Sequence, residues 1–275
     1  MDNSEIKAKI ETELKIQGKS PMTIKMYTYF NNKFICFINK KPKDVTTDDI
    51  KMFLAELLSR GNDPGSVALA RSSLKYFYDD ILEMNLMQKI KTPKKQRKIP
   101  EVLNREEVKL LISNAGSLRN KLLIEFMYSS GLRVAECAKL KIKDLNLPEK
   151  TGLLKYGKGG KDRFFILSER LIIDLKEYFS KRLDDGTYIF PGNDGPLTTR
   201  AIQDVIKRIA KRSGLRKHVY CHGLRHAFAT HLLDSGTDIR LIQELLAHSN
   251  LQTTQFYTQV SKEQLKKVRS PLDDI

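Results

Sequence analysis

Apolar residues recur at helical spacing through the first part of the chain. The first repeat runs every four positions and comprises Ile6, Ile10 and Leu14. Such spacing places the side chains on one face of an α-helix. Gly18 breaks the pattern, and the Ser20-Pro21 pair after it is typical of an N-cap followed by a first helical turn. A second helix is therefore expected to run through Ile38.

Two more helices complete this region. Thr46 or Thr47, followed by two aspartates, is expected to start a third helix that ends near Ser59. The GNDPG run at residues 61–65 predicts a turn. A fourth helix is expected to carry the apolar residues Leu69, Leu74, Phe77, Ile81 and Leu82. Residues 1–90 are thus predicted to form a small helical bundle.

Residues 91–100, KTPKKQRKIP, interrupt this periodicity with two prolines and a basic run. Such a segment predicts a linker between two domains. Its basic side chains are Lys94, Lys95, Arg97 and Lys98. They either remain solvated on a simple connector or lie along a phosphate backbone, and the sequence leaves both interpretations open.

The pattern of residues 101–275 is mixed but mostly helical. Asn104 followed by Glu107 is typical of a capping box. Two apolar runs around the glycine- and lysine-rich turn at residues 157–162 predict a β-hairpin, and residues 188–190 are compatible with a short strand. The predicted fold is mainly α with a small antiparallel β element. Its helices are expected over residues 104–113, 117–129, 168–183, 198–213, 222–235, 238–247, 251–257 and 261–269.

The composition favours a polyanionic partner. The 275 residues contain 49 Lys and Arg against 33 Asp and Glu, a formal net charge of +16. Folded proteins this basic commonly bind nucleic acid, because lysine and arginine release counterions from phosphates. A generally lysine-rich protein with solvated helix faces would look similar on charge alone.

Other features of the sequence point to the cytoplasm. No apolar run approaches the roughly 20 residues of a membrane span, and the charged N-terminal stretch lacks the apolar core of a secretory signal. The cysteines are few and widely spaced, at Cys36, Cys137 and Cys221. This spacing argues against a disulfide framework and against a cysteine-rich zinc module.

All the histidines lie in or just before residues 220–258: His218, His222, His226, His231 and His248. In the HGLRH run, His222 shares one side of a predicted helix start with Arg225 and His226. The free N–H groups of a helix N-terminus and the fork of a guanidinium are suited to hold a phosphate. The simpler interpretation is a capping histidine with surface charges.

The spacing of His222 and His226 is also that of a zinc-binding helix. The acidic residue of the H-E-x-x-H pattern is replaced here by Gly223, and Arg225 would repel a cation. We therefore expect no metal at this site.

Two further side chains are candidates for phosphate chemistry. Lys158 lies in the predicted hairpin turn, which matches no P-loop, and a lysine placed there could protonate a leaving alkoxide. Tyr257 lies in the polar run TTQFYTQ, so its hydroxyl is expected at a polar surface and could be a nucleophile. The simpler alternatives are a solvated lysine and an ordinary helix end.

Taken together, these segments resemble the tyrosine recombinase (phage integrase) family, in particular its Xer-type members. The matching segments, in chain order, are GLRVAE with Arg133 and Glu136, GKGGKDR with Lys158, HGLRH with Arg225, LLAHSN with His248, and TTQFYT with Tyr257. The family often has glycine where this chain has Ala247, and the small alanine predicts little consequence.

The resemblance implies a helical core-binding domain over residues 1–90, which binds DNA, and a catalytic domain over residues 101–275. The two would form a C-shaped clamp on DNA. The segment of residues 261–272 resembles the family's C-terminal oligomerisation helix, which docks on a neighbouring subunit; the alternative is that it folds back on its own domain.

The resemblance also implies a reaction. Tyr257 would attack the scissile phosphodiester, leaving a 3′-phosphotyrosyl link and a free 5′-hydroxyl. Arg133 and Arg225 would clamp the non-bridging oxygens, and Lys158 would protonate the departing oxygen. Because cationic side chains supply the charge neutralisation, neither a metal nor another cofactor is expected.

The remaining residues have supporting roles by the same resemblance. His222 would assist proton movement at the tyrosine, and His248 would hydrogen-bond a phosphate oxygen. Glu136 would orient the site rather than react. Lys161, on the same turn as Lys158, and the basic linker residues are expected to contact DNA.

Recombination of this kind takes place in a tetramer on two duplex DNA sites. The helical bundle begins within the first residues of the sequence, so no arm-type DNA-binding domain is expected, which favours a resolvase of chromosome or plasmid dimers. An integrase or invertase of a mobile element is one alternative. Others are a DNA-binding protein of the same fold without catalysis, a type IB topoisomerase-like enzyme and, least compatible with the residues, a metalloenzyme.

Overall fold

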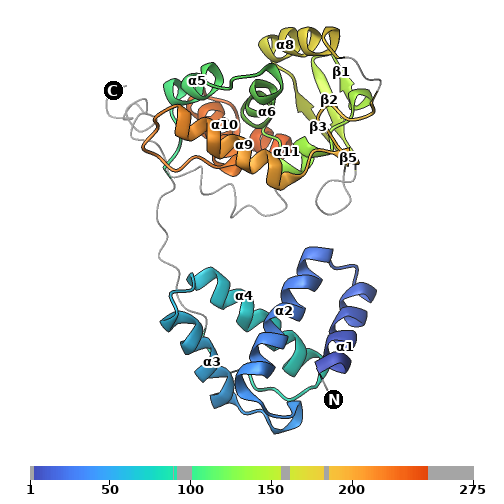
Figure 1. Ribbon diagram of the computed structural model, residues 1–275, viewed down its shortest axis with the longest axis vertical. Helices are drawn as coiled ribbons and strands as arrows, with labels where there is room; N and C mark the ends of the chain where they lie inside the picture. The colour runs from blue at the N-terminus through green and yellow to red at the C-terminus, as the bar shows by residue number, and fades with distance from the viewer. Residues whose placement is uncertain (1–2, 89, 92–100, 156–161, 183–185, 247–275) are drawn as a thin grey trace, which may run out of the picture. The chain divides into compact units, whose positions relative to one another are not determined.

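The computed structural model divides the chain into two compact units, Met1–Ile99 and Pro100–Ile275. Figure 1 shows their helices and strands. The structure describes residues 3–88, 90–91, 101–155, 162–182 and 186–246. The predicted linker over residues 91–100 and the helices predicted over 251–257 and 261–269 therefore fall largely or wholly outside the described residues.

The described part of the first unit is helical throughout. It contains four α-helices, a 3-10 turn and a π-helix: α1 (Asn3–Ile16), α2 (Pro21–Ile38), η1 (Pro42–Asp44), α3 (Thr47–Ser59), α4 (Pro64–Lys75) and η2 (Tyr76–Ile81). Helix α2 packs against α1, α3 and α4. The prediction of a small helical bundle is confirmed.

Local side-chain chemistry sets where these helices begin. The Ser20 hydroxyl accepts a hydrogen bond from the Thr23 backbone N–H at 3.1 Å, which caps α2 as its sequence predicts. Thr46 and Asp49 form a reciprocal capping box at the start of α3. Asp49 also accepts from the Lys40 ammonium at 2.8 Å.

The fourth helix differs from the prediction. It is regular only to Lys75, and the chain continues as the π-helix η2 instead of a straight α-helix through Leu82. The change coincides with three successive aromatic residues, Tyr76, Phe77 and Tyr78, all of which are buried in the core of the unit. Their burial was not predictable from the helical period alone, which places successive side chains on different faces.

The second unit combines helices with two small antiparallel sheets. Its helices are α5 (Arg105–Ser113), α6 (Leu118–Ser129), α7 (Val134–Ala138), α8 (Glu169–Ser180), α9 (Thr199–Arg212), α10 (Cys221–Asp234) and α11 (Ile239–Leu246), with a 3-10 turn η3 (Ile142–Asp144). The predicted capping box of Asn104 and Glu107 opens α5. The mainly helical fold with a small antiparallel sheet is confirmed.

The larger sheet has three strands in the order β1-β2-β3. Strands β2 (Thr151–Leu154) and β3 (Arg163–Ile166) form the predicted antiparallel pair. Strand β1 (Leu145–Asn146), which the sequence analysis did not predict, pairs with β2. Gly152 lies opposite Phe165, and a Cβ on Gly152 would come within 2.1 Å of the Phe165 ring, so the aromatic side chain fills the space that the glycine leaves.

Residues 188–190, which the sequence left compatible with a short strand, do not form one. Tyr188 makes only an isolated bridge with Lys141, while the strands β4 (Pro191–Gly192) and β5 (Gly195–Pro196) follow it. Ile189 and Phe190 are fully buried and belong to the core of the unit. Their apolar run therefore reflects burial in the core rather than a strand.

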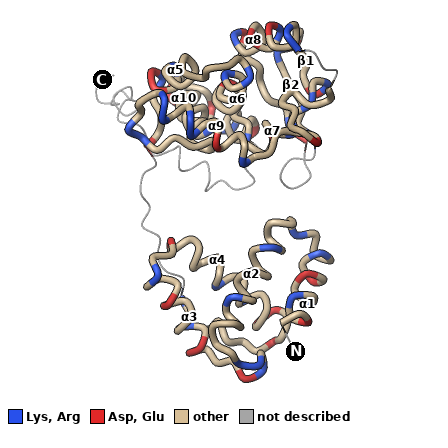
Figure 2. Tube along the Cα trace, viewed as in Figure 1, with Lys and Arg blue, Asp and Glu red and all other residues tan. Residues whose placement is uncertain are grey.

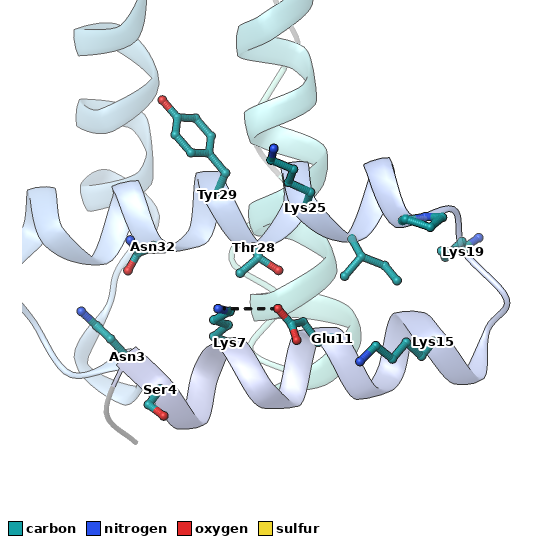
Figure 3. Close-up of a pocket in the computed structure, with 12 residues that line it drawn as sticks. Asn3, Ser4, Lys7, Glu11, Lys15, Lys19, Lys25, Thr28, Tyr29 and Asn32 are labelled. Carbon is teal, nitrogen blue, oxygen red and sulfur yellow. Dashed lines mark ion pairs between the residues drawn. The ribbon is translucent and has the colours of Figure 1, made fainter. Parts of the chain in front are cut away.

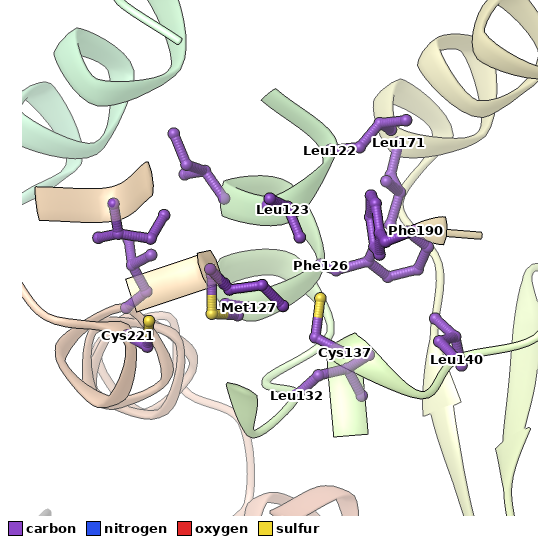
Figure 4. Packing of buried hydrophobic residues seen from close by; sticks show 14 of the residues in the cluster. Leu122, Leu123, Phe126, Met127, Leu132, Cys137, Leu140, Leu171, Phe190 and Cys221 are labelled. Atoms are coloured by element: carbon purple, nitrogen blue, oxygen red, sulfur yellow. The ribbon is translucent and has the colours of Figure 1, made fainter. Parts of the chain in front are cut away.

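Helix α6 lies at the centre of the second unit. It packs against α5, α7, α8, α9 and α10, and every residue from Leu122 to Met127 is buried. Figure 4 shows Leu123, Phe126 and Met127 of this helix among core side chains from its neighbours. A helix that is buried around most of its circumference gives a rigid support for the loop that follows it.

That loop turns at Gly131, in a conformation that only glycine adopts without strain. Gly131 has a φ of +61°, and a Cβ there would lie 2.5 Å from the ring of Phe228 in α10 and 3.0 Å from the Leu246 side chain in α11. The turn thus brings the start of α7 close to both α10 and α11. It places Arg133 next to the residues described below.

Two other properties bear on function. Every helix in the described part of the chain is too short or too polar to cross a lipid bilayer. The cysteines are free thiols, with Cys36 exposed and Cys137 and Cys221 buried.

We predict that Gly131→Ala destabilises the second unit by about 2–5 kcal/mol. The expected loss is the sum of two costs. A residue with a Cβ in the left-handed conformation costs about 1–2 kcal/mol, and overpacking against Phe228 costs about 1–3 kcal/mol. Denaturant unfolding followed by circular dichroism measures the change. Gly214→Ala is the matched control, since Gly214 has a φ of +66° but nothing within 4 Å of its added Cβ. Equal losses in both variants would show that the contact with Phe228 contributes nothing.

Candidate phosphate-binding site

The site begins at the N-terminus of α7, where Arg133 is the N-cap residue. The Arg133 backbone N–H donates to Glu136 Oε2 at 2.8 Å, and its guanidinium Nη1 donates to Glu136 Oε1 at 2.7 Å. Arg133 and Glu136 were both predicted from the GLRVAE segment. The structure joins them directly through a short helix of five residues.

A third residue, Arg163, binds the same carboxylate from the sheet. Its Nη2 donates to Glu136 Oε2 at 2.6 Å, and its side chain is 5% exposed. Arg225 approaches from α10, with Nη1 at 3.8 Å from Glu136 Oε2. Three guanidiniums from α7, β3 and α10 therefore surround one carboxylate.

The same arginines bind the C-terminal end of α11. Arg225 donates to the carbonyl oxygens of Gly131 and Leu246, each at 2.5 Å. Arg133 donates to the Leu246 carbonyl at 3.3 Å, and Arg163 donates to the carbonyl of Leu245. Carbonyls at a helix C-terminus lack partners within their own helix and carry partial negative charge, so they are natural acceptors for cations.

Charge in this cluster is strongly unbalanced. Burial alone would raise the pKa of Glu136, but the charge of Arg163 and the hydrogen bonds from Arg133 outweigh it, and the pKa lies below its ordinary value. The carboxylate is thus ionised at neutral pH and is the one acid that the described residues place against the three guanidiniums. The remaining charge favours an anion, and Arg133, whose side chain is 26% exposed, is the most accessible guanidinium of the three.

His222 lies in the first turn of α10, one turn before Arg225. Partial desolvation and the positive charges of Arg225 and Arg133 lower its pKa below the ordinary 6.5. Its ring packs edge-to-face against His226 at 4.3 Å between centroids. The pKa of His226 is lowered further, to about 4, by burial and by its proximity to His222 and Arg225. Both rings are therefore neutral at pH 7, and His222 is able to accept a proton.

The structure brings together four of the predicted site residues: Arg133, Glu136, His222 and Arg225. The others lie outside the described residues: Lys94, Lys95, Arg97, Lys98, Lys158, Lys161, His248 and Tyr257. In the sequence, His248 follows Leu246 by two residues, and the segment with Lys158 connects β2 to β3.

Arg163 was missed by the sequence analysis. It ends the GKGGKDR segment, in which only the lysines were considered. The sequence of β3 gave no signal for it, because the exposed residues that alternate with Arg163 and Phe165 are the apolar Phe164 and Ile166. A charged residue at an inward position of a strand requires a buried partner.

The described part of the site disfavours a metal ion. Within the described ranges, no three His, Cys, Asp or Glu side chains are grouped so as to hold one. The surplus of guanidinium charge would also repel a cation. The neighbouring thiol is not a nucleophile either, because burial raises the pKa of Cys221 to about 11.

Both units match known protein families by sequence. Residues 101–264 match the Phage integrase family, and residues 7–88 match the phage integrase N-terminal SAM-like domain. The tyrosine recombinase XerA of Pyrococcus horikoshii is 38% identical over 270 residues, which cover 96% of this chain and 92% of that protein. The tyrosine recombinase XerD of Listeria innocua is 35% identical, with 92% of each chain covered.

Solved structures agree with these matches. The XerH site-specific recombinase bound to palindromic difH substrate in a post-cleavage complex has a TM-score of 0.79 and 25% identity, covering 99% of this chain and 85% of that one. A lambda integrase dimer bound to a core site has a TM-score of 0.75, covering 92% of this chain and 94% of that one. At 20% identity, the second likeness is one of fold.

We predict that Glu136→Gln destabilises the second unit by about 3–5 kcal/mol, because it removes the charge that offsets the buried Arg163 and Arg225 and the partly exposed Arg133. Denaturant unfolding at neutral pH measures the change. Glu169→Gln is the matched control. Its partner Lys150 lies at 2.7 Å, but both side chains are more than half exposed, so a loss below about 1 kcal/mol is expected.

Acidification provides a second readout for the same variant. Because the folded pKa of Glu136 lies below the ordinary 4.5, its contribution to stability is fully present above pH 4.5 and is lost as the pH falls through the folded pKa. Glu136→Gln should therefore lose less stability than the wild type over that window. Equal losses would contradict the role assigned to this carboxylate.

Proposed function

Because the chain belongs to the phage integrase family, we propose which of its residues perform the reaction of a tyrosine recombinase. The protein is a site-specific recombinase of the Xer type, which cleaves and rejoins DNA strands. The observation that carries the assignment of residues is the cluster of Arg133, Arg163 and Arg225 around Glu136, with the neutral His222 beside it.

The proposed reaction is a pair of transesterifications. The Tyr257 hydroxyl attacks the scissile phosphorus, the bond from phosphorus to the 5′-oxygen breaks, and a 3′-phosphotyrosyl link forms. The tyrosine proton passes to His222, and Lys158 donates a proton to the departing 5′-oxygen. A 5′-hydroxyl of the second DNA then attacks the phosphotyrosyl link and releases the tyrosine.

Arginine charge lowers the barrier of both steps. Negative charge builds up on the phosphoryl oxygens in the transition state, and Arg133 and Arg225 are assigned to neutralise it. A single arginine contributes roughly 10³–10⁵ in rate in other phosphoryl-transfer enzymes. Arg225 donates to the Leu246 carbonyl in this structure, so a bound phosphate would share or replace that acceptor.

Histidine and lysine supply the proton transfers. A free tyrosine has a pKa of about 10, so it requires a proton acceptor to become a nucleophile at neutral pH. His222 is suited to this role because its lowered pKa keeps it neutral. His248 is assigned a hydrogen bond to a phosphate oxygen, and Glu136 a positioning role. With these cations in place the reaction is proposed to need neither a metal nor another cofactor.

The proposed substrate is duplex DNA at a specific site, and the proposed role is the resolution of chromosome or plasmid dimers in the cytoplasm. Support comes from the similarity to XerA and XerD proteins and to a recombinase bound to difH DNA. The basic linker residues and Lys161 are assigned to DNA contacts. Recombination is proposed to occur in a tetramer on two DNA sites.

We predict that Tyr257→Phe abolishes the covalent DNA adduct while retaining DNA binding. The wild type is incubated with genomic DNA in EDTA, denatured and digested with nuclease, and the residual nucleotide on the protein is located by mass spectrometry. The expected wild-type product carries a nucleotide on Tyr257, formed in the absence of divalent metal. Sequencing the DNA that stays attached to the protein before nuclease digestion maps the cleavage position.

A matched control separates Tyr257 from another tyrosine near the proposed site. Tyr220 is 39% exposed and lies two residues before His222, and Tyr220→Phe should still form the adduct. An adduct on Tyr257→Phe would refute the assignment of the nucleophile. A strict requirement for Mg²⁺ would refute the metal-independent mechanism.

We also predict that truncation after Val260 weakens assembly on DNA, because residues 261–272 are assigned to dock on a neighbouring subunit. Cooperative binding to DNA carrying two mapped sites is measured by gel shift and by sedimentation. The truncated chain keeps Tyr257, so nicked substrates test its cleavage separately. Unchanged cleavage together with unchanged cooperativity would rule out the exchange of this segment between subunits.

A further inference from the structure

Of the three arginines around Glu136, only Arg163 has no role in the proposed reaction. Charged residues of the second unit mostly lie at its surface, as along α8, where Figure 2 shows basic and acidic residues near one another and where Lys176 and Lys181 are exposed. Arg163 instead lies in β3 with its side chain 5% exposed. Burial of a guanidinium is costly, so the contacts that compensate it indicate what the residue does.

Both terminal nitrogens of Arg163 are bound within the protein. Nη2 donates to Glu136 Oε2 at 2.6 Å, and Nη1 donates to the carbonyl oxygen of Leu245. Arg133, whose side chain is 26% exposed, is far more accessible. Buried and held in this way, Arg163 acts on a substrate only through the two groups that it binds.

The first of these groups is the carboxylate of Glu136, which other arginines also approach. Its Oε2 accepts from the Arg133 backbone N–H at 2.8 Å as well as from Arg163. Arg225 Nη1 lies 3.8 Å from the same oxygen, beyond hydrogen-bond distance. Opposite charges at this separation attract each other strongly where water is largely excluded. Arg163 therefore occupies the position on Oε2 to which Arg225 would otherwise be drawn.

The second group is the C-terminal end of α11. Arg163 binds the Leu245 carbonyl from the sheet. The next carbonyl, that of Leu246, is bound by Arg133 and Arg225. Carbonyls at a helix C-terminus carry partial negative charge, and Arg163 offsets part of it. Without Arg163, the arginines assigned to the phosphate would have to neutralise this helix end alone.

Both contacts of Arg163 affect the proposed reaction in the same direction. Arg133 and Arg225 are assigned to the phosphoryl oxygens, and stronger contacts with Glu136 or with α11 would leave less of their charge for that task. Loss of Arg163 removes one positive charge and draws the other two toward acceptors inside the protein. The phosphoryl oxygens carry most negative charge in the transition state, so the loss should affect the rate of cleavage more than the binding of DNA.

We propose that Arg163 is a positioning residue for strand cleavage. By binding Glu136 and the end of α11, it leaves the charge of Arg133 and Arg225 to the scissile phosphate. This inference rests on the proposed function, because the phosphate contacts belong to the proposed reaction. The alternative is that Arg163 only stabilises the fold, and the experiment below distinguishes the two roles.

The test compares Arg163→Met with a matched control in the full-length chain. Arg163→Met keeps an unbranched side chain and removes the charge together with both hydrogen bonds. Arg182→Met is the control, since Arg182 also binds two backbone carbonyls of the second unit, those of Tyr188 at 2.8 Å and Gly186 at 3.1 Å, but does not contact the cluster. Single-turnover cleavage is measured on a duplex that carries the mapped cleavage position. The scissile group is either the natural phosphate or a methylphosphonate, in which a methyl group replaces one charged oxygen.

On the phosphate, Arg163→Met should cleave about 10- to 100-fold more slowly than the wild type, the range found for residues that orient a metal ligand without touching the metal. Its affinity for the duplex should be unchanged. On the methylphosphonate, which has less charge to neutralise, the rates of the two chains should be nearly equal. Arg182→Met should match the wild type on both substrates. Arg163→Lys keeps the charge without the planar fork, so it should lose less, with the same preference for the methylphosphonate.

Equal losses on both substrates would overturn the proposal, because a role in folding alone does not depend on the charge of the substrate. A rate for Arg163→Met equal to that of the control on the phosphate would also overturn it. Circular dichroism verifies that each variant is folded at the assay temperature, and if Arg163→Met is not, Arg163→Lys provides the same comparison. Failure of the proposed function is seen separately, as a wild type that forms no covalent adduct on Tyr257.

Discussion

One partly buried carboxylate organises the second unit. Glu136 accepts hydrogen bonds from Arg133 and Arg163 and lies 3.8 Å from Arg225. Without this negative charge, three guanidiniums from a helix start, a strand and a second helix would repel one another in a poorly solvated interior. The carboxylate therefore permits the fold to hold a surplus of positive charge where a phosphodiester is proposed to bind.

Backbone carbonyls at the end of α11 complete the same network. The oxygens of Leu245 and Leu246 accept from the three arginines, so the end of this helix is tied to the cluster. Gly131 makes this approach possible, because any side chain there would collide with Phe228 and Leu246. His248 and Tyr257 follow α11 in the chain. The anchored end of this helix therefore fixes the point from which the segment with the proposed nucleophile starts.

The two units use positive charge in different ways. In the second unit the charge is largely buried, fixed by hydrogen bonds and concentrated on arginines, which suits the stabilisation of a transition state. In the first unit, Lys7, Lys15, Lys19 and Lys25 line a groove between α1 and α2 (Figure 3), with Glu11 as the one acid among the lining residues.

The sequence alone determined the helical bundle, most helix boundaries, the β2–β3 hairpin and the family. These features depend on local signals: the period of apolar residues, capping side chains such as Ser20 and Asn104, and short motifs that can be read in order. It also identified Arg133, Glu136, His222 and Arg225 as a group. Tertiary structure alone decided that Arg163 joins them, that Arg225 faces the carbonyls of Gly131 and Leu246, and that four lysines of α1, α2 and their connection line one groove. These contacts join residues that are distant in the sequence or lie on separate helices, and no local pattern specifies which side chains meet once the helices pack.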